Sequence, residues 1–61
     1  MNLNEQKHPF YFEYFNNRKS DWMFESGIIN DEPAKEILLR YVREFPYVRN
    51  ITLDHLPVSD Y

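Results

Sequence analysis

Aromatic residues are concentrated in residues 8–15 (HPFYFEYF), and this density predicts a β-strand whose side chains alternate between two faces. A polar cluster follows at residues 16–20 (NNRKS) and predicts a turn, because asparagine tolerates positive φ. A second alternating run, residues 21–29 (DWMFESGII), predicts another strand. The three segments together indicate a β-hairpin with a loop of about five residues. Gly27, the only glycine of the chain, indicates either a bulge or a close approach of the backbone.

The period then changes to that of an α-helix. Apolar residues recur three and four positions apart on one stripe, which comprises Ala34, Ile37, Leu38, Tyr41, Val42 and Phe45. Residues 30–31 (Asn-Asp) supply an N-cap, and Pro33 fits the first turn of a helix. Pro46 disfavours helical backbone at the residue before it and so ends the helix. Leu39 lies beside the stripe, where we expect partial exposure.

A period of two returns at residues 47–55 (YVRNITLDH), which predicts a third strand. The order strand, strand, helix, strand favours one α+β domain over residues 1–61: a two-layer β-β-α-β sandwich with a mainly antiparallel three-stranded sheet. Because the first strand is the most apolar, we expect it in the centre, in the order 2-1-3. The order 1-2-3, with a right-handed crossover, is the alternative. Residues 1–7 and 57–61 are predicted to be flexible tails.

A single helix covers only one face of this sheet. The covered face is predicted to hold Phe10, Phe12, Tyr14, Trp22, Phe24, Ile28, Ile51 and Leu53. The uncovered face then holds Tyr11, Phe15, Met23 and Ile29, together with Glu13, Glu25, Asn50 and Thr52. A solvated sheet face usually carries few large apolar groups, so the first four residues are predicted to form an interface. Alternatively, a terminal segment covers them with Leu3, Leu56 or Val58.

Size and composition favour self-association. The chain has 61 residues, a formal net charge of −3, 18% aromatic residues and no cysteine. A domain this small buries only about 60% of its unfolded surface, and without disulfides association is a common remedy. The strand at 21–29 offers a second route to a dimer as a poorly protected sheet edge. No run of residues is long and apolar enough for a membrane span, and we expect a cytoplasmic protein.

Candidate catalytic and metal-binding groups are few. Ser20, Ser26 and Ser59, with His8 and His55, are the only material for a hydrolytic triad, and no nucleophile elbow surrounds any of the serines. The two histidines approach one another if the first and third strands are neighbours, yet two imidazoles do not complete a zinc site. The sequence therefore predicts no enzyme activity, no bound metal and no cofactor.

The aromatic residues also fit a second function. Tyr11 and Phe15 on an open sheet face would stack with the bases of a single-stranded nucleic acid, with Arg18 and Lys19 nearby. The net charge of −3 weighs against this alternative, because binding to phosphates depends on positive charge.

The sequence therefore predicts a non-catalytic, homodimeric protein-binding module that acts through the open sheet face or the strand at 21–29. A chain this short suits a regulatory or inhibitory role towards a protein partner, like that of small proteins encoded by phages or mobile elements.

Overall fold

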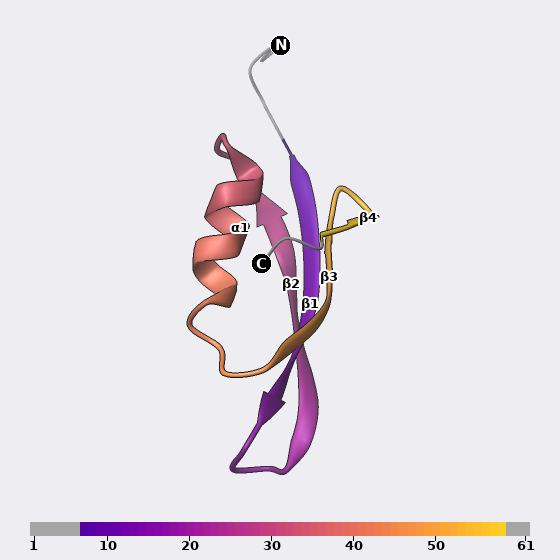
Figure 1. Ribbon diagram of the computed structural model, residues 1–61. Coiled ribbons are helices and arrows are strands. Elements are labelled where there is room, and N and C mark those ends of the chain that lie inside the picture. The colour runs from indigo at the N-terminus through magenta and orange to yellow at the C-terminus, as the bar shows by residue number, and fades with distance from the viewer. Residues whose placement is uncertain (1–6, 59–61) are drawn as a thin grey trace.

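The computed structural model describes residues 7–58, which form a four-stranded sheet with one helix beside it (Figure 1). The elements along the chain are β1 (His8–Asn16), β2 (Asp21–Ile29), α1 (Ala34–Val42), β3 (Val48–Leu53) and β4 (Leu56–Pro57). The sheet is antiparallel throughout, in the order β2-β1-β3-β4. The predicted α+β class, the central position of the first strand and the order 2-1-3 are confirmed, while the short β4 was not predicted.

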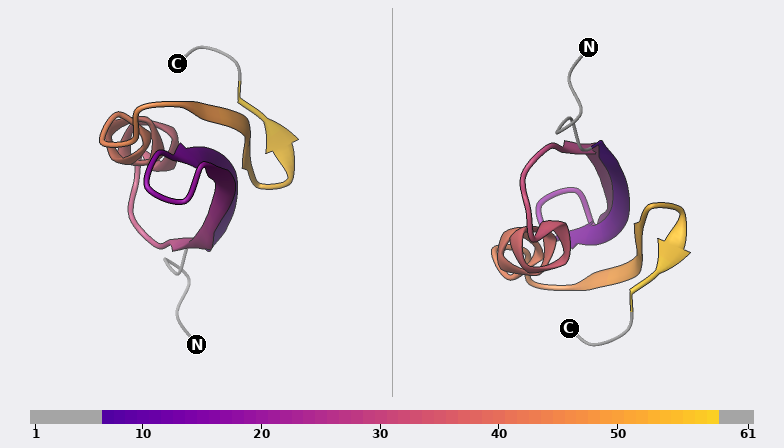
Figure 2. Two further views of the ribbon diagram at one scale, coloured as in Figure 1. Left: turned by 90° about the horizontal axis from the view of Figure 1, so that it is seen from below. Right: turned by 90° about the horizontal axis from the view of Figure 1, so that it is seen from above.

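The helix lies along one side of the sheet, and the sheet curls so that α1 occupies its concave side (Figure 2). The core between the two layers consists of Phe12, Ala34, Leu38, Val42 and Ile51. Phe12 and Leu38 are fully buried. The ring of Phe12 meets that of Tyr41 on α1 edge-on, at 5.7 Å between centroids, so a single aromatic residue of the central strand joins both layers.

The pairing of β1 with β2 reverses the predicted faces of β2. Asn16 pairs with Asp21 across a loop of four residues, 17–20, so each even-numbered residue of β1 faces an odd-numbered residue of β2. Phe12 accordingly faces Glu25. The residues of β2 on the side of α1 are therefore Met23, Glu25, Gly27 and Ile29. Those on the side away from α1 are Trp22, Phe24, Ser26 and Ile28.

This reversal follows from the length of the loop. A strand has a side-chain period of two, so lengthening or shortening the loop by one residue moves every side chain to the other face. The predicted loop, 16–20, has five residues, whereas Asn16 belongs to β1 and its side chain instead organises the turn. The Asn16 Oδ1 atom accepts hydrogen bonds from the backbone N–H groups of Arg18 (3.0 Å) and Lys19 (3.2 Å).

Gly27 faces the ring of Phe10 across the β1–β2 pair. A Cβ atom at Gly27 would lie 3.2 Å from two atoms of this ring. The close approach that the sequence suggested is therefore a contact between backbone and ring on the covered face.

The helix is shorter than predicted at both ends. Pro33 is extended (φ −81°, ψ 124°) and precedes the helix instead of lying in its first turn, and no side chain caps the N-terminus. At the other end α1 stops at Val42, and the backbone N–H groups of Glu44 and Phe45 bond to carbonyls three residues earlier. The last predicted turn is thus a tighter i→i−3 turn. Leu39, for which we expected partial exposure, is partly exposed and packs against the core.

The third predicted strand ends earlier than expected. Asp54 and His55 both have positive φ (54° and 65°) and form the two-residue turn of the hairpin between β3 and β4. β3 also contains a bulge, because its pairing with β1 shifts by one residue at Asn50, whose φ is 55°. Of the predicted tail at 57–61, Pro57 belongs to β4, and Val58 packs against the core and donates its N–H to the Ile51 carbonyl.

Candidate interaction surface

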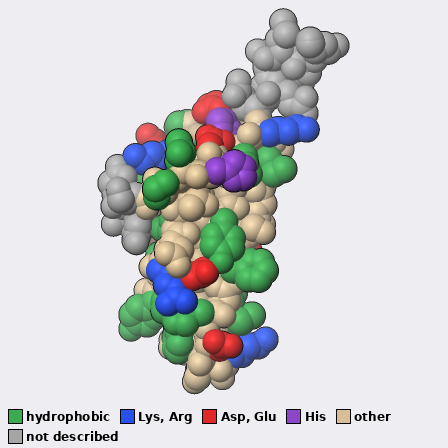
Figure 3. Space-filling view, turned by 90° about the vertical axis from the view of Figure 1, so that its right-hand side faces the viewer, with side chains coloured by type: hydrophobic (Ala, Val, Ile, Leu, Met, Phe, Trp, Pro, Cys, Tyr) green, Lys and Arg blue, Asp and Glu red, His purple; other side chains and the backbone are tan. Residues whose placement is uncertain are grey.

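The face of the sheet that α1 leaves uncovered carries two pairs of aromatic rings. Tyr11 stacks on Phe24 at 5.9 Å between centroids, and Phe15 meets Trp22 edge-on at 5.5 Å. These four residues and Ile28 lie on the uncovered side of the sheet, which is called the open face below. In the view from the side of the sheet away from α1, hydrophobic side chains extend along the molecule with basic and acidic groups among them (Figure 3).

A polar network fills the centre of this surface. The Glu13 carboxylate accepts hydrogen bonds from the Tyr11 hydroxyl (2.5 Å), Arg49 Nε (2.7 Å) and Asn50 Nδ2 (3.0 Å). These donors favour the charged form, Tyr11 most, and lower the pKa of Glu13 to about 2. The same bond raises the pKa of the Tyr11 hydroxyl. The Arg49 guanidinium also lies 3.8 Å over the ring of Trp22, so the network and the rings hold each other in place.

The exposed apolar groups of the open face concentrate on β2. Phe24 is 64% exposed and Ile28 is 57% exposed, whereas Tyr11, Phe15 and Trp22 are half-buried. β2 is also the last strand of the sheet on this side, and no strand pairs with its outer edge within residues 7–58. Exposed apolar side chains and unpaired backbone therefore coincide on one strand.

The structure places the four predicted interface residues on different faces. Tyr11 and Phe15 lie on the open face, as predicted. Met23 pairs with Tyr14 on the covered side, and Ile29 packs against the core, so the prediction that both face outwards is wrong. Trp22, Phe24 and Ile28 lie on the open face instead of Met23 and Ile29. The sequence signal that identifies them is whether the hairpin loop has an even or an odd number of residues.

The alternative in which a terminal segment covers the open face receives no support from the C-terminal side. Leu56 is 66% exposed, and Val58 packs against the core instead of the outer surface. Leu3 lies outside the described residues.

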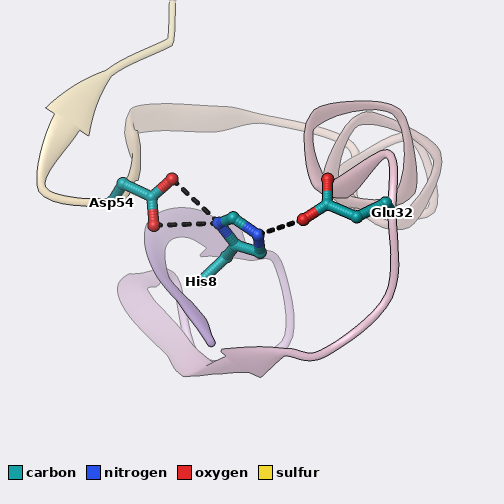
Figure 4. Close-up of polar contacts among 3 residues, drawn as sticks. All are labelled: His8, Glu32 and Asp54. Carbon is teal, nitrogen blue, oxygen red and sulfur yellow. Dashed lines mark hydrogen bonds and ion pairs between the residues drawn. The ribbon is translucent and has the colours of Figure 1, made fainter. Parts of the chain in front are cut away.

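His8 forms a second polar cluster at one end of the sheet (Figure 4). Its Nδ1 atom lies 3.0 Å from Asp54 Oδ2, and its Nε2 atom bonds to Glu32. The imidazole thus joins the start of β1, the loop before α1 and the turn between β3 and β4. Both carboxylates, Asp54 first, raise the pKa of His8 above its usual 6.5, because both ring nitrogens are donors only in the protonated ring.

This cluster is suited to holding three segments together. Both nitrogens of His8 are occupied by carboxylates, so neither is free to accept a proton from a nucleophile. At this end of the sheet His8 bonds to Asp54, the residue before His55. The contact found here therefore joins a histidine to a carboxylate, and not the two histidines as predicted. Ser59 lies outside the described residues. Within residues 7–58 no pocket is found, and no group of three or more potential ligands is arranged to hold a metal ion.

Comparisons with known protein families, with characterised proteins and with solved structures found no match for this chain. In the described part of the chain, the helix is too short and too polar to cross a membrane.

Proposed function

We propose that this protein is a non-catalytic, cytoplasmic protein-binding module that works as a homodimer and regulates or inhibits a further protein. Its first partner is a second copy of the same chain. The observation that carries this proposal is the coincidence, on β2, of the exposed side chains of Phe24 and Ile28 with an unpaired strand edge. Apolar groups exposed beside unpaired backbone favour association with another strand.

The small size of the core supports the same proposal. Only five apolar residues of the described part are buried, namely Phe12, Ala34, Leu38, Val42 and Ile51. A core of this size rarely provides more than about 3–5 kcal/mol of stability, and a second copy that binds only the folded chain adds to it by mass action.

Binding of a single-stranded nucleic acid is the competing function, since its bases would stack on the same rings. Within residues 7–58, Arg49 is the cation found in contact with these rings, over Trp22, and its charge is opposed by Glu13 at 2.7 Å. The chain as a whole carries a net charge of −3. Phosphate binding depends on cations that are not already neutralised, so these charges favour the protein partner.

The test measures mass and nucleic-acid binding on the same preparation. Light scattering over a hundredfold dilution should give twice the chain mass of 7.5 kDa at high concentration and a fall towards 7.5 kDa on dilution. Ile28→Ser should weaken the dimer at least tenfold. The matched control is Leu56→Ser, which removes an equally exposed aliphatic side chain at the opposite edge and should leave the dimer unchanged.

Fluorescence anisotropy with oligo(U) and oligo(dT) at low and high salt completes the test. We expect no salt-sensitive binding. A constant mass of 7.5 kDa at every concentration would overturn the dimer. Salt-sensitive binding that is lost in Tyr11→Ala would instead support the nucleic-acid function.

A further inference from the structure

The outer edge of β2 is open along the part of the strand that is richest in exposed groups. Ser26, Gly27 and Ile28 are consecutive and all exposed, although their side chains alternate between the two faces. Neither layer of the molecule covers this segment. At the start of β2 the Trp22 N–H group is already satisfied, because it donates to Asp21 Oδ1 at 2.8 Å. Residues 23–29 are therefore the part of the edge that offers pairing to another chain.

We infer that a second copy of the chain pairs with this edge in an antiparallel arrangement, with Ser26 directly opposite Ser26 of the other copy. This inference rests on the proposed homodimer and specifies its seam. A two-fold axis perpendicular to the sheet passes between the two serines and makes the contact isologous. Such an axis keeps the open face of both copies on the same side of the joined sheet.

The side chains of β2 are self-complementary about Ser26. On the open face Phe24 lies opposite Ile28 of the other copy, and the same pair recurs on the other side of the axis. On the covered side Met23 lies opposite Ile29. Aromatic and β-branched residues directly opposite one another are a favourable cross-strand combination. The charge on this segment, Glu25, falls opposite Gly27 of the other copy, which has no side chain to oppose it.

Neighbouring registers that keep the faces matched lack this complementarity. An axis at Glu25 places that carboxylate opposite itself, and like charges directly opposite are destabilising. An axis at Phe24 leaves Ile28 and Ile29 beyond the paired segment, opposite the hairpin loop of the other copy. An axis at Gly27 likewise places the residue opposite Phe24 beyond the end of β2. The register at Ser26 alone pairs all the apolar residues of 23–29 with each other.

The seam merges the two open faces. Phe24 and Ile28 of both copies come together at the centre of a sheet that continues from β4 of one chain to β4 of the other. The aromatic pairs of Tyr11 with Phe24 flank this centre in each copy. The dimer therefore presents one continuous apolar surface where each chain alone presents half of it, and this surface is the one available to a regulated protein.

Cysteine cross-linking tests the register directly, because the chain contains no cysteine. In Ser26→Cys the two Cβ atoms of a directly opposed pair lie about 4.5–5.5 Å apart, close to the span of a disulfide. Mild oxidation should convert most of this variant to a covalent dimer at a rate independent of dilution within the dimeric range. The matched control is Ser20→Cys. Its two copies lie on the order of 40 Å apart in this register and should cross-link at least tenfold more slowly.

A pair of lysine substitutions then separates an edge seam from contact between two open faces. Ser26→Lys places like charges opposite each other at the axis and should weaken the dimer at least tenfold. Thr52→Lys adds the same charge on the uncovered side of β3, away from this edge, and should leave the dimer unchanged. Circular dichroism should show both variants folded, since Ser26 is exposed and Thr52 is outside the core.

The outcomes distinguish this seam from the proposed function. Two results would overturn the seam and leave the homodimer standing. One is a dimer that resists Ser26→Lys but is broken by Thr52→Lys. The other is a dimer in which the Ser26→Cys variant cross-links no faster than the Ser20→Cys control. A chain that is monomeric at every concentration would overturn both the seam and the homodimer.

Discussion

The Arg49 guanidinium lies 3.8 Å from the centroid of the Trp22 ring, although Arg49 and Trp22 belong to strands that are not neighbours. β1 runs between them and provides Glu13, which faces Arg49, and Phe15, which faces Trp22. The two contacts of Arg49, with the Glu13 carboxylate and with the indole, therefore connect three strands on the open face.

We expect the contact between Arg49 and Trp22 to show as a coupling between the two residues. A cation over an exposed aromatic ring contributes about 0.5–1 kcal/mol. In a double-mutant cycle of Arg49→Ala and Trp22→Leu, the combined loss of unfolding free energy in urea should be smaller than the sum of the single losses by about this amount. The cycle of Arg40→Ala with Trp22→Leu is the control and should show additive losses, because Arg40 lies on α1. Additive losses for Arg49 as well would contradict the contact.

The carboxylate of Glu13 makes the stability of the fold depend on acid. Its pKa falls from 4.5 to about 2 in the folded chain, so its hydrogen bonds contribute stability that is fully present above about pH 4.5. That contribution is lost as the pH falls towards 2. Urea unfolding between pH 2 and 6 should therefore show a larger advantage of the wild type over Glu13→Gln at pH 6 than at pH 2. The prediction fails if the difference between the two proteins is the same at both pH values.

His8 should have the opposite dependence on pH. Its pKa is raised in the folded chain by Asp54 and Glu32, so the charged ring contributes stability below pH 6.5, and this contribution is lost as the pH rises through the raised pKa. The ¹H–¹³C spectrum of the imidazole should titrate above 6.5. Unfolding free energy should fall with pH above 6.5 in the wild type and not in His8→Gln. The matched variant His55→Gln lies at an exposed position of the turn between β3 and β4, next to Asp54. It should retain the dependence of unfolding free energy on pH that the wild type shows.

The fold followed from the sequence because its main signals are local. Period-two runs gave the two strands of the hairpin, the apolar stripe gave the helix, and the concentration of aromatic residues in β1 placed it in the centre of the sheet. The turn at Asp54 and His55 was missed, because neither residue is a glycine and the positive φ values become visible only in the structure. The first boundary of α1 was missed because Pro33 precedes the helix instead of beginning it, and the last because residues 43–45 form a tighter i→i−3 turn.

The open face was only half predictable, for a reason that concerns one residue. Whether Asn16 belongs to the strand or to the loop changes the loop length by one and inverts β2. Hydrophobicity favours Trp22 and Phe24 inside, yet the structure places Glu25 and Gly27 on that side. The side chain of Asn16 decides the matter through its bonds to the turn, a long-range consequence of a local contact. The cluster of His8 with Asp54 was missed because 46 residues separate the two in the chain.

A pair of phenylalanine substitutions distinguishes the two possible faces of β2. Phe12→Ala removes a fully buried ring and should cost about 3–5 kcal/mol, comparable with the whole stability of so small a domain, so that circular dichroism shows a largely unfolded chain. Phe24→Ala removes a ring that is 64% exposed and stacked on Tyr11, and should cost about 1 kcal/mol. In the register expected from the sequence, Phe24 would lie opposite Phe12 on the covered face. Both rings would then be buried, and the two losses would be similar. At a concentration where the chain is monomeric, Phe12→Ala should show little folded signal by circular dichroism without urea, while Phe24→Ala should keep a urea transition close to that of the wild type. Dimer formation then contributes nothing to either result.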